Sequence, residues 1–361
     1  LYENTTGQYN TAVGAIAQHE ITTGERNTAI GYAASYKNIN GDYNVACGMM
    51  ALYNSLAGYN TAAGYQALFT NTTGEENTAT GYRALYTNTT GSENTVTGYQ
   101  ALYTNSTGSY NTANGYNALV SNTTGANNCG FGYKALNTNS TAANNSGFGY
   151  KALFANTGIG NSAIGHLALQ VNSTGTYNTA GGAQALDENT TGSNNVALGS
   201  LALRRVTTGS GNIGIGFINN AGSYTPVYNP ITDSNRLVLG HTAITSAYVK
   251  VAWTVTSDAR DKMNFAPVPY GLDFVNQLKP TAYQFKIDRE TETPNGPVLY
   301  GFKAQDILAL EGDNPVIIDT EDTDNLKYKG EHLVPVLVNA VQELTAMVKE
   351  LKAEVAALKS A

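Results

Sequence analysis

Hydrophobic and polar positions repeat about every 17 residues over the first 219 residues of the chain. The most regular polar position is an asparagine with a glycine four residues later, and it recurs at Asn10, Asn27, Asn44, Asn60, Asn77, Asn94, Asn111, Asn128, Asn145, Asn161, Asn178, Asn195 and Asn212. The most regular apolar position lies eight residues after the asparagine and is leucine in ten of the thirteen units, from Leu52 to Leu203. A period this short predicts a solenoid with one coil per repeat.

Each unit is too short for two helices and a turn. Segments such as NTTG supply turn residues, and they separate short stretches such as TAT and YRALY. We therefore predict a mainly β fold, with two short strands per coil stacked as a parallel β-roll or β-helix. The position two residues after the asparagine holds only Ala, Val or Gly. Because one leucine per coil makes a thin core, we expect this row of small residues to pack closely against a neighbouring chain.

The repeated asparagines and tyrosines each have two interpretations. The asparagines form either a hydrogen-bonded ladder of turn residues, which we favour, or a polar binding face. Asn-x-Ser/Thr triplets are possible glycan acceptors but coincide with the turn pattern, and they begin at Asn71, Asn88, Asn105, Asn122, Asn139, Asn172 and Asn189. Tyrosines five residues after the asparagine either pack between coils or bind glycan. These tyrosines are Tyr32, Tyr65, Tyr82, Tyr99, Tyr116, Tyr133 and Tyr150.

Several units resemble the head repeats of trimeric autotransporter adhesins. The segments NSAIG at 161–165, NVALG at 195–199 and NIGIG at 212–216 carry this resemblance. It implies a left-handed parallel β-roll in which three chains surround one axis, and it covers about residues 1–219.

The pattern changes after residue 219. Residues 220–256 lose the period, and NRLVLG and ITSAYVKVAWTV predict a β-rich neck. Farther on, YGLDFVNQL predicts a helix that ends before Pro280, and AQDILALE predicts another. TAYQFKI and VLYGFKA alternate like strands, with a turn expected at TETPNGP. We expect a small α+β domain at 257–361.

Residues of about 333–360 form a heptad pattern. Valine occupies position a at Val334, Val341, Val348 and Val355, and leucine occupies position d at Leu337, Leu344, Leu351 and Leu358. Four such heptads predict a coiled coil. Valine at a with leucine at d favours two strands, which conflicts with the three implied by the repeats; we give the repeats more weight and expect a homotrimer.

Charge is sparse and unevenly distributed. The net charge is -7, with nine acidic and seven basic residues in 1–219 against eighteen and thirteen in 220–361. Neither region is basic, which argues against nucleic-acid binding. Cys47 and Cys129 lack disulfide or metal-ligand spacing and are expected to be small buried hydrophobes. We expect no cofactor, no metal site and no membrane insertion, since no apolar run approaches 18 residues. The start at Leu1 inside a repeat indicates a fragment without its N-terminal anchor.

The stretch SDARDK holds the candidate chemistry. From the residues alone, Ser257 is a good helix N-cap, with Asp258 and Asp261 in the first turn of the helix. A catalytic pair of Ser257 and Lys262 is the alternative. On a regular helix the two side chains would point about 140° apart, so only the reach of the lysine would join them.

Three motifs in this region resemble, in order and spacing, the endosialidase-type intramolecular chaperone domain, found in phage tail fibres and in the myelin regulatory factor family. They are SDARDKMNFAPVPYGLDFVNQLKPTAYQFK, LYGFKAQDI and LKYKGEHLVPVLVNAVQEL. The resemblance implies a domain that trimerises, folds the fibre before it and then cuts itself off. It maps the nucleophile to Ser257 and the lysine to Lys262. Asp261 departs from the family, where an apolar or basic residue is common.

These expectations combine into one leading hypothesis. A trimeric fibre at 1–219 binds a host-surface glycan or protein, and its chaperone domain cleaves between Thr256 and Ser257 as a single-turnover serine endopeptidase with no external substrate. Its expected location is the virion. The alternatives are a bacterial cell-surface adhesin, which would be extracellular, and a chaperone domain that trimerises without cutting.

Overall fold

The computed structural model describes residues 2–218, 222–224, 226–242, 244, 257–286, 292–313, 315–321, 323–324 and 326–360. The chain divides into two compact units, Leu1–Ile244 and Thr245–Ala361. The first is called the solenoid below and the second the C-terminal unit. Of the neck, the expected strand ITSAYVKVAWTV lies outside the described residues except at Ile244.

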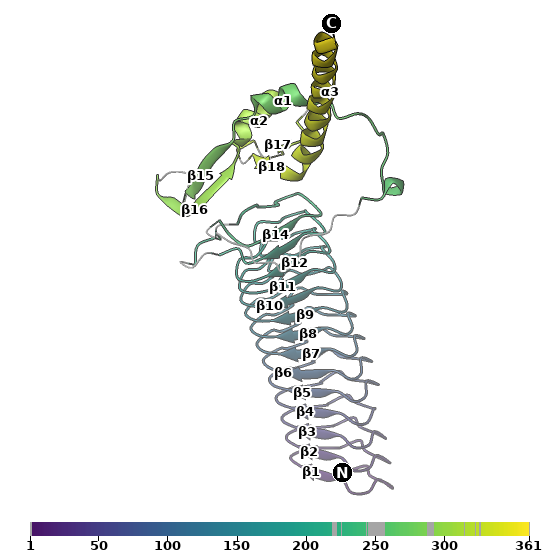
Figure 1. Ribbon diagram of the computed structural model, residues 1–361. Helices are drawn as coiled ribbons and strands as arrows, with labels where there is room; N and C mark the ends of the chain where they lie inside the picture. Colours follow the sequence, from purple (N-terminus) through teal and green to yellow (C-terminus); the bar gives the residue numbers. More distant parts are fainter. Residues whose placement is uncertain are drawn as a thin grey trace. The chain divides into compact units, whose positions relative to one another are not determined.

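The solenoid is built on one sheet of fourteen parallel strands that follow one another in chain order (Figure 1). Its strands are β1 (Thr11–Val13), β2 (Thr28–Ile30), β3 (Val45–Cys47), β4 (Thr61–Ala63), β5 (Thr78–Thr80), β6 (Thr95–Thr97), β7 (Thr112–Asn114), β8 (Cys129–Phe131), β9 (Ser146–Phe148), β10 (Ser162–Ile164), β11 (Thr179–Gly181), β12 (Val196–Leu198), β13 (Ile213–Ile215) and β14 (Leu237–Leu239). Each repeat position pairs with its equivalent one coil on, as Ala62 does with Ala79. The predicted solenoid is therefore confirmed, and β14 extends its sheet into NRLVLG.

The second strand predicted for each coil is wrong. The segment after the glycine forms turns, in which left-handed residues recur at two fixed positions such as Gln66 (φ 53°) and Leu68 (φ 51°). This conformation curls the chain and is uncommon for residues other than glycine. The segment still bonds to the next coil, because the Leu68 amide donates to the Ala84 carbonyl at 3.0 Å. Inter-coil hydrogen bonding thus continues without a second sheet.

Leucine and alanine fill the interior of each coil. Leu68, with Ala62 and Ala67 from the same coil, has no exposed surface, and the equivalent residues repeat this along the core. A side chain at Gly130 would meet Leu119 Cγ at 3.3 Å, so the row of small residues faces the leucines. The expectation that this row faces a neighbouring chain is wrong. Its residues are small because the leucine ladder occupies the same narrow interior.

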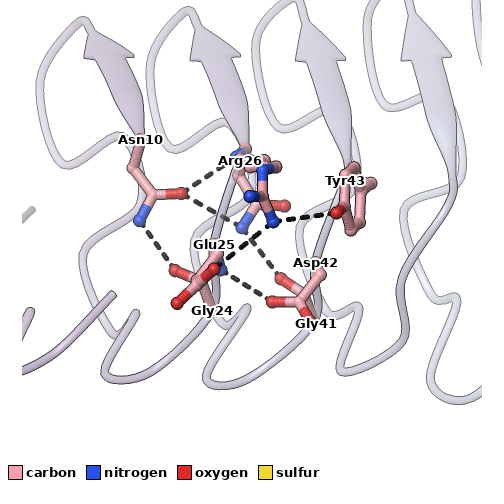
Figure 2. A network of polar contacts seen from close by, with 8 residues as sticks. Asn10, Gly24, Glu25, Arg26, Gly41, Asp42 and Tyr43 are labelled. Carbon is pink, nitrogen blue, oxygen red and sulfur yellow. Dashed lines mark hydrogen bonds and ion pairs between the residues drawn. The ribbon is translucent and has the colours of Figure 1, made fainter. Parts of the chain in front are cut away.

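The repeat asparagines form the expected hydrogen-bonded ladder. Figure 2 shows Asn10 directed at Gly24, whose carbonyl accepts a hydrogen bond from Asn10 Nδ2 at 2.7 Å. Asn10 Oδ1 accepts the backbone N–H of Asn27, one coil on, at 2.9 Å, and Asn27 Oδ1 accepts that of Asn44. Each side-chain amide thereby closes its own coil and joins the next. Buried polar groups are stable only when paired in this way.

The asparagines of the glycan-acceptor triplets form a second ladder. Asn88 Nδ2 donates to Asn71 Oδ1 at 2.7 Å, and Asn105 Nδ2 donates to Asn88 Oδ1 at 2.8 Å. The side chain of every triplet asparagine is buried. Since a glycan needs an accessible amide nitrogen, the turn interpretation is confirmed and the glycan alternative is wrong.

The C-terminal unit contains short elements around a small core. In chain order they are η1 (Ala259–Asp261), α1 (Leu272–Gln277), β15 (Thr281–Lys286), β16 (Pro294–Gly301), α2 (Ala304–Glu311), β17 (Ile318–Asp319), β18 (Lys327–Tyr328), η2 (Gly330–His332) and α3 (Leu333–Ser360). β15 pairs antiparallel with β16, and β17 with β18. Both predicted short helices are confirmed. The turn expected at TETPNGP is wrong from Pro294 onward, because those residues belong to β16.

Helix α3 has two apolar faces. Leu333, Val336 and Ala340 are buried against the core that contains Phe274 and Ile307. The a and d positions of the heptads lie elsewhere on the helix, and all eight of those side chains are exposed. The predicted helix is confirmed, whereas its pairing into a coiled coil remains a prediction.

Candidate functional site

Ser257 and Lys262 are in contact. Lys262 Nζ lies 2.6 Å from Ser257 Oγ, within hydrogen-bonding distance. The intervening η1 is a single 3-10 turn, and Lys262 leaves it in an extended conformation with φ -127° and ψ 151°. This geometry brings the lysine back toward the serine, which a regular α-helix would not do over five residues.

Asp258 shapes the turn between the two side chains. Its Oδ1 accepts the backbone N–H of Arg260 at 2.9 Å, and its Oδ2 forms an ion pair with Arg260 Nη2 at 2.5 Å. These interactions with Arg260 lower the pKa of the Asp258 carboxyl. Asp258 is the N-cap of η1, so the expectation that Ser257 caps this helix is wrong. The Ser257 hydroxyl is consequently available to Lys262.

Both members of the pair are exposed in the single chain, as are all the residues of 257–269. Thr256, the other side of the predicted cleavage bond, lies outside the described residues. A lysine acts as a general base only where its surroundings lower its pKa, and burial is the usual cause.

The predicted tyrosine ladder lies on the solenoid surface and is stacked. Its rings pack face to face on one another from Tyr65 to Tyr150, with centroids 5.0–5.3 Å apart. His166 continues the row beyond Tyr150. Tyr82 is 39% exposed and Tyr116 is 45% exposed, so the edges of the rings face solvent. Packing between coils, the favoured interpretation, is therefore confirmed for this stretch.

The sequence reasoning missed a second aromatic row, nine residues after the repeat asparagine. It contains His19, Tyr36, Tyr53, Phe69, Tyr86 and Tyr103, with centroids 5.1–5.2 Å apart. The same 17-residue period would have revealed it. Cys47 was also misjudged: it is exposed, because it follows buried Ala46 on a strand whose alternate residues point outward. Cys129 is half-buried.

Within the described ranges, no group of three or more His, Cys, Asp or Glu residues could hold a metal ion. No helix in that part of the chain is long and apolar enough to cross a membrane.

A solenoid of about 17-residue coils, followed by a small β/α region that ends in a long helix, fits a fibre-type protein with a C-terminal assembly domain. Residues 257–314 match the family described as chaperone of endosialidase. The chain therefore fits a tail-fibre-type protein with a C-terminal chaperone domain, and a chaperone domain of such a fibre family implies oligomerisation. No curated protein and no solved structure matches the chain.

Proposed function

We propose that this chain is a trimeric attachment fibre whose C-terminal domain directs assembly and then releases itself by cutting between Thr256 and Ser257. The observation that carries the proposal is the 2.6 Å contact between Ser257 Oγ and Lys262 Nζ at the start of the matched region. Serine and lysine are a known pairing of nucleophile and base.

The chemistry follows from the two side chains. Neutral Lys262 accepts the hydroxyl proton of Ser257 while the Ser257 oxygen attacks the carbonyl carbon of Thr256. The bond from that carbon to the Ser257 nitrogen breaks, the nitrogen takes up a proton, and an ester joins the two residues. Water hydrolyses the ester, which leaves a carboxylate on Thr256 and restores the Ser257 hydroxyl. The chain is cut once and acts on no other substrate.

Assembly supplies the change of environment that this chemistry needs. The a and d side chains of α3, including Val341 and Leu344, form an exposed apolar stripe of the kind that neighbouring helices cover in a coiled coil. Association of three copies would bury this stripe and cover the exposed Lys262. Burial lowers the pKa of a lysine, so cutting would follow correct assembly.

Mass spectrometry of the purified full chain tests the cleavage. We expect two fragments, the smaller beginning at Ser257. Ser257→Ala should leave the bond intact and still assemble, because it removes one oxygen from an exposed residue. Asp261→Ala, on the same turn but outside the pair, is the matched control and should be cut. Intact wild-type chain that has assembled would leave a chaperone domain without cleavage as the function.

A bacterial surface adhesin is the second candidate. The repeated units with small residues behind the asparagine favour it, since they support an adhesin stalk as well as a virion fibre. In either case the partner on the host or target surface would be a glycan or a protein. A signal peptide in the encoding gene would favour the adhesin, and a virion-attachment domain would favour the fibre.

A further inference from the structure

Two polar side chains of α3 bind the backbone of the segment that follows the Ser257–Lys262 pair. Glu343 Oε2 accepts the backbone N–H of Leu272 at 2.7 Å, and Asn339 Nδ2 donates to the carbonyl of Tyr270 at 2.8 Å. Asn339 Nδ2 also lies 3.5 Å from the carbonyl of Val268. These contacts join positions about 70 residues apart in the sequence.

The segment is shaped to receive Glu343. Gly271 is the N-cap of α1 and makes no side-chain cap hydrogen bond. A side chain at Gly271 would meet Glu343 Oε1 at 2.1 Å, so glycine leaves the space that the carboxylate occupies. Glu343 thus caps α1 from another helix, and its negative charge lies at the positive end of the α1 dipole.

The chain between Lys262 and Tyr270 has limited freedom. Pro267 and Pro269 fix their own φ angles and restrict the residues before them to extended conformations. Asn264 is held in a left-handed conformation at φ 58°. A short segment of this kind transmits position better than a glycine-rich linker of equal length would.

The two contacts leave the heptad face of α3 free. Asn339 and Glu343 lie on the side of the helix that carries Val336 and Ala340, which are buried in the unit's own core. The exposed a and d side chains are on the other side. Copies of α3 can therefore associate through the heptads without breaking either contact.

We propose that Asn339 and Glu343 are positioning residues, which tie the Ser257–Lys262 segment to α3 so that association of α3 fixes where the pair lies. The inference rests on the proposed self-cleavage and names the link between assembly and cutting. Neither residue touches the reacting atoms. Their effect is on how often the pair reaches the geometry in which the serine attacks.

The test compares four variants of the full chain: Glu343→Ala, Glu343→Gln, Asn339→Ala and the control Glu350→Ala. Glu350 has the same heptad position as Glu343, one heptad on, and is exposed. Cutting is followed by gel during cell-free synthesis, and association by chemical cross-linking. We expect Glu343→Ala and Asn339→Ala to be cut about tenfold more slowly at equal association, as loss of one buried-geometry contact typically gives. Glu343→Gln keeps an oxygen acceptor and should stay within about threefold of wild type.

A second readout does not depend on cleavage. In a Ser257→Ala background, trypsin should cut after Lys262 faster in Glu343→Ala than in Glu350→Ala, because the tether that restrains the segment is lost. Equal tryptic rates, or equal self-cutting by all four variants, would overturn the positioning role. An uncut wild-type chain with unequal tryptic rates would support the tether and refute only the proposed self-cleavage.

Discussion

The ring of Tyr82 lies 5.1 Å from the ring of Tyr99, with the two planes 6° apart. Tyr116 stacks on the other face of Tyr99 in the same way. Both faces of Tyr99 are therefore covered by neighbours. A sugar ring stacks on the face of an aromatic ring, so the interior of this row offers edges and hydroxyl groups instead.

Replacement of Tyr82, Tyr99 and Tyr116 by Ala should destabilise the solenoid. Four stacked pairs are lost, and aromatic pairs contribute roughly 0.5–1.5 kcal/mol each beyond their buried area. We expect a clear fall in the melting temperature, measured by circular dichroism. Tyr177→Ala, an exposed tyrosine outside this row, is the control and should have a small effect. An unchanged melting temperature with lost cell-surface binding would instead identify a glycan-binding surface.

Lys262→Arg should abolish cutting at Thr256–Ser257. Arginine preserves the positive charge and the reach of the side chain, but it does not release its proton in proteins. Lys262→Ala should also block the reaction. The measurement is the fraction of full-length chain on a gel after purification, with Lys279→Arg as a control that keeps normal cutting. Cleavage at the wild-type rate in Lys262→Arg would rule out the lysine as base.

A chain that ends at residue 253 should fail to assemble. The solenoid has few charges and its contacts within a coil stack are formed between residues 17 apart, while contacts between chains are more distant still; slow, non-local assembly exposes apolar surface to aggregation. We expect insoluble or polydisperse material by light scattering. The uncut Ser257→Ala chain, made in parallel, should give one oligomer. Comparable yields of the same oligomer from both chains would contradict a chaperone role for 257–361.

Alkaline conditions should weaken the solenoid through Tyr224. Burial raises the pKa of Tyr224 to about 12, and its hydroxyl donates to Asn229 Oδ1 at 3.0 Å. The unfolded chain loses this proton near its model value of 10.0, so the stabilisation is complete below pH 10 and is lost as pH rises through 12. Tyr224→Phe should show a smaller loss of stability between pH 10 and 12 than wild type, measured by urea unfolding. Equal losses in both proteins would contradict the burial of this hydroxyl.

The sequence was informative wherever a single position repeats. The ladders of Asn77 and Leu85 could be predicted because each recurs at one place in every coil, and stacking places equal positions above one another. The second half of the coil could not be predicted, because YRALY has the alternation of a strand while its left-handed residues, such as Leu85 at φ 52°, depend on the whole coil closing. Periodicity reports which residues share a row and does not report backbone conformation.

The site divides in the same way. The pairing of Ser257 with Lys262 was anticipated from the motif, but the role of Asp258 as the cap depends on a turn shorter than the helix the spacing suggested. Asn339 and Glu343 were not anticipated, because they contact backbone atoms about 70 residues away and carry no local signal.

The register of the sheet makes length a heritable trait of this protein. Because Ala62 pairs with Ala79, and the same holds from coil to coil, a gain or loss of 17 residues keeps every row aligned and changes the solenoid by about 4.8 Å. An indel of any other size moves asparagines into leucine positions and is removed by selection. Unequal recombination between near-identical units such as NTATGYRALYTNTTGSE and NTVTGYQALYTNSTGSY can therefore lengthen or shorten the protein in whole steps. Populations that carry this gene should differ by multiples of one coil, which genome sequencing can count directly.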